Sequence, residues 1–186
     1  EEGDVTMAAG YYRRAIQYMP EHAGAHHYLA NQFYREGNYV TAAEHYADSL
    51  KGEPDNLGAL ISYMDTLLLG NAAPPLLLAE LEIAIQRAPE YPGFRSLQIL
   101  LLAGNPDSRV QDPEMALKLA QQLNEEYQIP PHQELLALAY AAGGNYEQAT
   151  AIQEQLLSTL PRGMPAEADR VSRTRSEERR VLTEGC

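Results

Sequence analysis

The stretch YLANQFYREGNYVTAAEHYADSLKGEPDN, residues 28–56, decides the fold that this sequence predicts. Its small and apolar residues recur at steps of three and four, which is the spacing of one face of an α-helix. Gly37 and Asn38 interrupt the pattern with residue types that suit the left-handed backbone of a turn. Pro54 ends the second half, because proline cannot continue a helix. The stretch therefore predicts two helices joined by a tight turn.

The second half of this stretch is one of several sets of residues spaced by four, three and five positions. The complete sets are Ala8, Tyr12, Ala15 and Pro20; Ala42, Tyr46, Ser49 and Pro54; Leu77, Leu81, Ala84 and Pro89; and Ala149, Gln153, Leu156 and Pro161. A fifth set, Ala116, Ala120 and Leu123, lacks the final proline. The sets begin at residues 8, 42, 77, 116 and 149, so they lie 34, 35, 39 and 33 residues apart. A period of about 34 residues is typical of a helix–turn–helix repeat.

In these residues the chain resembles the tetratricopeptide repeat, of the bacterial type. Segment 28–56 and segment 135–161, LLALAYAAGGNYEQATAIQEQLLSTLP, follow that pattern, although His26 and Gln133 replace its usual early Trp. The resemblance implies an all-α fold, a right-handed superhelical solenoid of antiparallel helix pairs with about 4.5 repeats. The repeats implied are 3–20 (second helix only), 21–54, 55–89, 90–128 and 129–161, followed by a charged C-terminal capping helix or tail at 162–186.

Two turns are longer than the pattern allows. In the first, Pro74 and Pro75 are expected to begin the next helix, where proline is tolerated. In the second, we expect a helix whose N-cap is Asp112, whose first residue is Pro113 and whose first turn carries the acidic Glu114. The intervening stretch 104–111 is then expected to project as a loop.

In the resembled fold, the first helices of the repeats line a concave groove. Carrying that phase onto this chain assigns nine residues to the groove: His27, Asn31, Tyr34, Arg35, Ile61, Asp65, Leu68, Glu134 and Leu138. Such a groove suits an extended peptide or an amphipathic helix, so we expect a protein or peptide partner. The sequence leaves open whether Ile61, Leu68 and Leu69 serve the groove or pack against the neighbouring repeat.

One known use of the fold is disfavoured. Some tetratricopeptide domains grip the terminal carboxylate of chaperone peptides with Lys, Asn and Arg from successive first helices. Asn31 matches one such Asn, but His27 stands where its Lys partner belongs. The only lysines, Lys51 and Lys118, fall in second helices.

The segment EHAGAHH, residues 21–27, holds three of the five histidines. His22 and His26 lie one helical turn apart and would suit a shared metal ion, but no third ligand is apparent nearby. His26 and His27 diverge by about 100° around a helix. We therefore expect no metal site and no cofactor, with His26 packed between helices and His27 facing the groove.

The composition of the chain disfavours several classes of partner and site. The net charge of −12 and a pI near 4.8 disfavour nucleic acid, whose phosphates need clustered Lys and Arg. Apolar runs such as 99–103 are too short for direct membrane insertion. Cys186 is the only cysteine, so no internal disulfide forms. No phosphate-binding, nucleophile-elbow or HExxH motif is present, so we expect no enzyme.

The sequence leaves two alternative hypotheses open. The chain is a recruiting or regulatory segment of a larger enzyme, such as a glycosyltransferase, whose catalytic part precedes residue 1. Alternatively, it self-associates as a homodimer through the apolar face of its first helix, formed by Val5, Ala8, Tyr12 and Ile16. The cytoplasm is the favoured compartment, and the periplasm applies if the chain belongs to a secreted or membrane-anchored protein.

Overall fold

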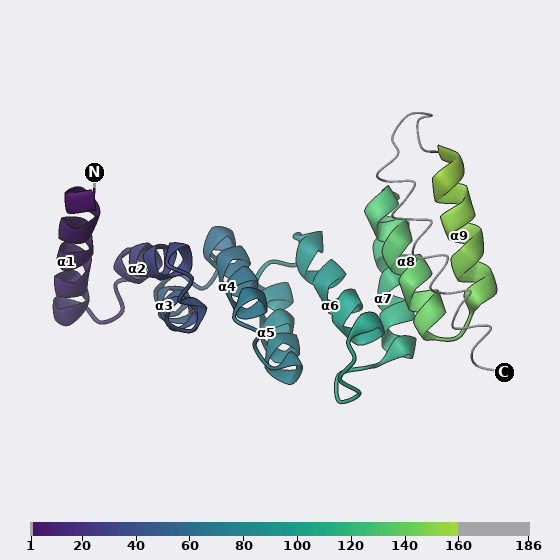
Figure 1. Cartoon of the computed structure of the whole chain (residues 1–186), viewed down its shortest axis with the longest axis horizontal. Helices are drawn as coiled ribbons and strands as arrows, with labels where there is room; N and C mark the ends of the chain where they lie inside the picture. The colour runs from purple at the N-terminus through teal and green to yellow at the C-terminus, as the bar shows by residue number, and fades with distance from the viewer. Residues whose placement is uncertain (1, 160–186) are drawn as a thin grey trace. The chain divides into compact units, whose positions relative to one another are not determined.

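The computed structural model describes the backbone of residues 2–159 and the side chains of residues 7–159. The described residues form helices and turns with no strand, which confirms the all-α prediction (Figure 1). The helices are α1 (Glu2–Tyr18), α2 (Ala23–Arg35), α3 (Tyr39–Gly52), α4 (Leu57–Leu69), α5 (Pro74–Arg87), α6 (Pro92–Gly104), α7 (Pro113–Glu126), α8 (Pro130–Ala142) and α9 (Tyr146–Thr159). The capping helix or tail expected at 162–186 lies outside the described residues.

The chain divides into two compact units, Glu1–Tyr91 and Pro92–Cys186. The first unit contains α1 to α5, and α3 packs against both α2 and α4. In the second unit α8 packs against α6, α7 and α9. Within each unit, short turns join neighbouring helices into pairs, as in a helical solenoid.

The turns inside the pairs have the local chemistry that the sequence predicts. Gly37 and Gly144 have φ angles of 75° and 79°, a left-handed conformation that glycine adopts without steric cost. Asn71, with φ 52°, takes the same conformation in the turn between α4 and α5. The side chain of Asn38 accepts a hydrogen bond from the backbone N–H of Thr41 at 3.3 Å and so caps α3.

Both irregular turns begin their following helices where expected. The α5 helix starts at Pro74, and Asp112 caps α7 by accepting the N–H of Met115 at 2.9 Å. The loop between α6 and α7 extends beyond the ends of the two helices, as expected, but its last residues are anchored (Figure 1). Val110 is only 4% exposed, and the Gln111 side chain closes the loop by donating to the Asn105 carbonyl at 2.7 Å.

The repeat positions form the core. Every helical member of the sets on α3, α5, α7 and α9, leaving aside the prolines that follow the helices, is buried: Ala42, Tyr46, Ser49, Leu77, Leu81, Ala84, Ala116, Ala120, Leu123, Ala149, Gln153 and Leu156. Ala30 and Ala42 have no exposed surface, because the small side chains let α2 and α3 approach closely. Ala8, Tyr12 and Ala15 in α1 are only half-buried. The observed burial confirms the phase of the repeat.

Candidate functional site

The nine residues predicted for the groove fall into two groups. Seven lie on α2 and α4 of the first compact unit, and we call them the α2–α4 surface: His27, Asn31, Tyr34, Arg35, Ile61, Asp65 and Leu68. Glu134 and Leu138 lie on α8 of the second unit. The two groups therefore belong to different compact units.

Tyr46 of α3 lies beneath the α2–α4 surface. Its side chain is 1% exposed, and its hydroxyl donates a hydrogen bond to Asn31 Oδ1 at 2.7 Å. The ring of His27 meets the Tyr46 ring edge-on, with centroids 5.6 Å apart. Two of the predicted residues thus contact the same buried tyrosine, which fixes their positions on α2.

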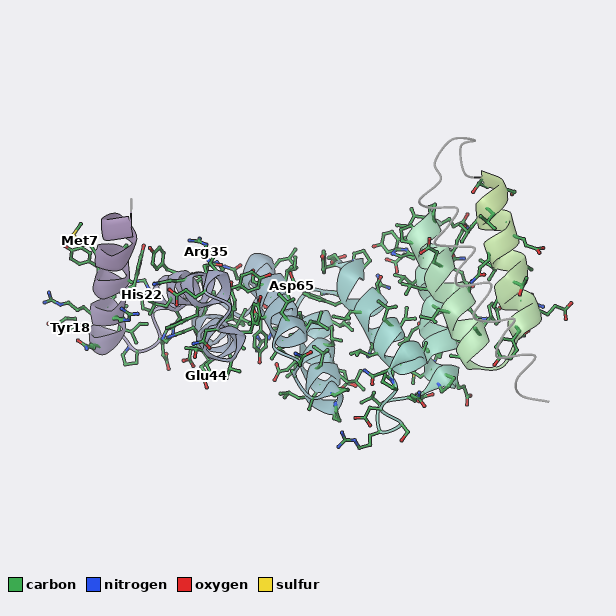
Figure 2. All side chains as sticks on the ribbon, viewed as in Figure 1. Met7, Tyr18, His22, Arg35, Glu44 and Asp65 are labelled. Atoms are coloured by element: carbon green, nitrogen blue, oxygen red, sulfur yellow. The ribbon has the colours of Figure 1, made fainter. Side chains whose placement is uncertain are left out.

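Charged residues from α2 and α4 act on the same hydroxyl. The pKa of Tyr46 is raised, chiefly by burial, while a hydrogen bond with Ser62 and the positive charge of Arg35 oppose the rise and Asp65 adds to it. Figure 2 shows Arg35 and Asp65 on this unit, with Glu44 on the side opposite Arg35. The structure therefore brings polar residues of two helices together around Tyr46.

The other α2–α4 residues differ in exposure. Tyr34 is half-buried: it meets Tyr39 edge-on at 5.6 Å and packs on the buried cluster of α2 and α3, so part of its role is structural. Ile61 is half-buried, whereas Leu68 is 40% and Leu69 47% exposed. The sequence left open whether Leu68 and Leu69 pack against a neighbouring repeat. Within the described residues, neighbouring side chains cover both leucines only in part.

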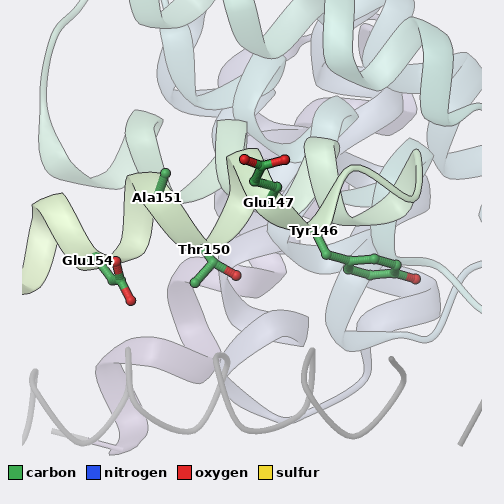
Figure 3. Close-up of a pocket in the computed structure, with 5 residues that line it drawn as sticks. All are labelled: Tyr146, Glu147, Thr150, Ala151 and Glu154. Carbon is green, nitrogen blue, oxygen red and sulfur yellow. The ribbon is translucent and has the colours of Figure 1, made fainter. Parts of the chain in front are cut away.

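In the second unit, Glu134 and Leu138 are both half-buried. A Cβ placed on Gly104 would lie 3.9 Å from Leu138 Cδ2, so Leu138 packs toward the end of α6. A shallow cavity of about 520 Å³ lies on α9 and is lined by Tyr146, Glu147, Thr150, Ala151 and Glu154 (Figure 3). All five come from one helix, and none was predicted for the groove.

The structure gives the N-terminal histidines separate roles. His22 Nδ1 accepts the backbone N–H of Ala25 at 3.2 Å, so this ring caps α2. His26 is 4% exposed, which confirms its predicted packing position. His22 is therefore not the partner of His26 that their spacing along the chain would allow.

Two residues of α3 meet His26 instead. His26 Nδ1 lies 3.0 Å from His45 Nδ1 and 3.7 Å from Asp48 Oδ2. Burial and the neighbouring His26 lower the pKa of His45, and Asp48 and Glu44 partly oppose this shift. The sequence offered one signal for this cluster, because His45 and Asp48 lie three apart on one helix. That signal predicts a contact with His26 only when it is known that this face of α3 packs against α2.

The apolar face of the first helix that the sequence predicted to be open is partly covered: Ala8, Tyr12 and Ile16 are half-buried. Tyr12 stacks on Tyr28 of α2, with ring centroids 4.2 Å apart, so α2 covers part of the face predicted to be open. The exposed apolar residues are instead Met7 at 60%, Tyr11 at 70% and Tyr18 at 79%. The side chain of Val5 lies outside the described residues.

No helix in the described part of the chain combines the length and the hydropathy needed to cross a membrane.

Comparison with known proteins identifies the fold. No family model matches the sequence. No curated protein sequence is significantly similar. Solved structures do match: YrrB, described as a tetratricopeptide-repeat protein with an unusual peptide-binding site, is 18% identical with a TM-score of 0.68, covering 87% of this chain and 81% of YrrB.

Two further structures agree. MamA is 15% identical with a TM-score of 0.65, covering 84% of this chain and 83% of MamA. TTC0263, a thermophilic tetratricopeptide-repeat protein of Thermus thermophilus, is 18% identical with a TM-score of 0.58, covering 95% and 91% of the two chains. These likenesses show that the chain has the tetratricopeptide-repeat fold.

Proposed function

We propose that this chain is a protein-interaction scaffold whose α2–α4 surface holds an extended peptide or an amphipathic helix of a partner protein. The scaffold itself carries out no chemical step in this proposal. The tetratricopeptide fold supports the general role, and YrrB is described as having a peptide-binding site. The particular surface rests on the contacts around Tyr46.

The observation that carries the proposal is the mixture of groups gathered there. Asn31 accepts the hydrogen bond of the buried Tyr46 hydroxyl, and the exposed Arg35 and Asp65 add a cation and an anion whose charges act on the pKa of Tyr46. Leu68 and Leu69 add exposed apolar surface at the end of α4. A peptide offers backbone donors and acceptors for the first group and apolar side chains for the second.

The test is a pair of matched substitutions measured against peptides that the whole chain selects from a random library. Leu68→Asp is expected to weaken peptide binding at least about tenfold, because it places a charge in an apolar contact; tenfold corresponds to about 1.4 kcal/mol. Leu76→Asp is the control, since Leu76 is similarly exposed, at 49%, but lies on α5. Fluorescence anisotropy gives the affinities, and circular dichroism checks that both variants stay folded.

A second pair tests the charged part of the surface. Arg35→Glu is expected to weaken binding, whereas Arg87→Glu, in the equivalent last turn of α5, is expected to leave it unchanged. Equal losses in both members of either pair, or no loss in Leu68→Asp and Arg35→Glu, would exclude the α2–α4 surface as the binding site. Asn31 and Tyr34 are less suitable for substitution, because they also contact Tyr46 and Tyr39.

Self-association remains a second proposal, now on a different face of α1. Met7, Tyr11 and Tyr18 are exposed and lie at helical spacing on one side of α1. Figure 2 shows Met7 and Tyr18 on the side of α1 that faces away from α2. Exposed apolar stripes of this kind are typical of contacts with a second chain.

We expect sedimentation velocity to show a dimer that accumulates as the concentration of the chain rises. Combining Tyr11→Lys with Tyr18→Lys should leave a monomer, because two charges would have to be buried in the contact. Val40→Lys is the matched control, since Val40 is 68% exposed on α3. A chain that stays monomeric at the highest attainable concentration rules this contact out.

A further inference from the structure

We propose that His26, His45 and Asp48 form a binding site for one divalent transition-metal ion, zinc in the first instance, which ties α2 to α3. One ligand atom from each of the three side chains lies within 4.8 Å of the other two. The proposal is independent of the peptide-binding surface, because none of these residues belongs to it.

The distances suit a small cation. Two donors that bind zinc tetrahedrally at about 2.0–2.1 Å lie about 3.3 Å apart. His26 Nδ1 is 3.0 Å from His45 Nδ1 and 3.7 Å from Asp48 Oδ2, on either side of that value. The Asp48 side chain is 39% exposed and its partner Lys51 is 68% exposed, so both side chains can turn together when the Asp48 carboxylate moves toward His45.

The hydrogen bonding of His26 leaves the lone pair of its neutral ring on Nδ1, the atom that faces His45 and Asp48. His26 Nε2 lies 2.8 Å from the carbonyl oxygen of Pro20. A carbonyl only accepts hydrogen bonds, so Nε2 carries the proton of the neutral ring. Nδ1 then holds the lone pair and faces His45 and Asp48, and this second-partner arrangement is typical of metal-binding histidines.

The other two ligands are also held by a second contact. The His45 ring stacks on Phe33, with centroids 5.5 Å apart and planes 6° from parallel. Lys51 Nζ donates to Asp48 Oδ1 at 2.6 Å, which leaves Oδ2 on the side of His26. In the metal-free protein the His45 Nδ1–H donates to His26 Nδ1. When the ion binds, His45 takes the other neutral tautomer and both Nδ1 atoms become ligands.

The donor set selects the class of ion. Two imidazoles and one carboxylate suit zinc and its first-row neighbours, whereas magnesium and calcium prefer oxygen ligands throughout. Three protein ligands leave room for water beside the partly exposed Asp48. The ion would join His26 of α2 to two residues of α3, so we expect it to stabilise the first compact unit.

The test is a titration of zinc into the whole chain carrying Cys186→Ser, measured by isothermal titration calorimetry. Cobalt serves as a substitute ion that can be observed by absorption spectroscopy. Cys186 is replaced so that its thiol contributes no ligand. We expect one ion per chain, visible d–d absorption for cobalt, no uptake of magnesium, and a thermal unfolding midpoint that rises with zinc. Asp48→Asn and His45→Gln, both at partly exposed positions, are each expected to lower zinc affinity at least about tenfold.

His132→Gln is the matched control. His132 is also buried, and its Nδ1 also lies against a backbone carbonyl, that of Tyr127 at 3.1 Å. It belongs to no three-ligand cluster among the described residues, so its replacement should leave zinc affinity unchanged. The site as assigned is overturned if the whole chain binds no zinc, or if either Asp48→Asn or His45→Gln retains full affinity while folded.

Discussion

Replacing Tyr46 with alanine is expected to lower the free energy of unfolding by about 3–5 kcal/mol, because it removes a large buried aromatic ring. Tyr46 is 1% exposed and forms a buried cluster with Ala30 and Ala42, against which Phe33 and Tyr63 also pack. These neighbours lie on α2, α3 and α4, so the cavity would open where three helices meet. Urea denaturation of the whole chain, followed by circular dichroism, measures the loss.

Tyr46→Phe distinguishes the contribution of the hydroxyl to stability from that of the ring. It removes the hydrogen bond to Asn31 but keeps the packing, and we expect a loss of about 1 kcal/mol. If Tyr46→Phe costs as much as Tyr46→Ala, polar contacts rather than ring packing stabilise this junction. A loss below about 1 kcal/mol for Tyr46→Ala contradicts the assignment of Tyr46 to the core.

Leu81→Ala is expected to lower the free energy of unfolding by about 2–5 kcal/mol, because it also leaves a cavity in the core. Leu81 has no exposed surface and occupies on α5 the repeat position that Tyr46 occupies on α3. The loss of stability therefore tests the repeat, since it measures the same position in the next pair of helices.

Leu76→Ala is the control for this measurement. Leu76 lies on the same helix but is 49% exposed, so its truncation should change the free energy of unfolding by no more than about 0.5 kcal/mol. Chemical denaturation of the two variants under the same conditions gives the comparison. Similar losses for Leu81→Ala and Leu76→Ala would mean that the helical phase of α5 is wrong.

Much of the candidate surface was predictable, because the repeat phase assigns faces to helices. The same phase that buries Tyr46 and Leu81 on second helices assigns Asn31 and Asp65 to first helices, where Asn31 accepts the Tyr46 hydrogen bond and the charge of Asp65 acts on the pKa of Tyr46. The phase does not tell how exposed each residue is. Leu68 remains 40% exposed, whereas Leu138 is half-buried and lies near Gly104, and spacing along one helix does not say which side chains of other helices cover a residue.

The first helix illustrates the limit of periodicity. Its apolar residues fit a helix, but several faces carry them: Tyr12 on one side, and Met7, Tyr11 and Tyr18 on another. Periodicity alone does not choose between two apolar faces. The stacking of Tyr12 on Tyr28 chooses one of them, because it depends on where α2 crosses α1.

The sequence by itself determined the helices and turns of this protein, since these depend on neighbours along the chain: a left-handed Gly37, a capping Asp112 and the four–three spacing of the buried residues. The tertiary structure alone decided which side chains of different helices meet. His26 and His45 lie 19 positions apart, and their 3.0 Å approach follows from the packing of α2 on α3. Backbone preference acts over one turn of helix, whereas the position of a cross-helix cluster is set by how two packed surfaces fit.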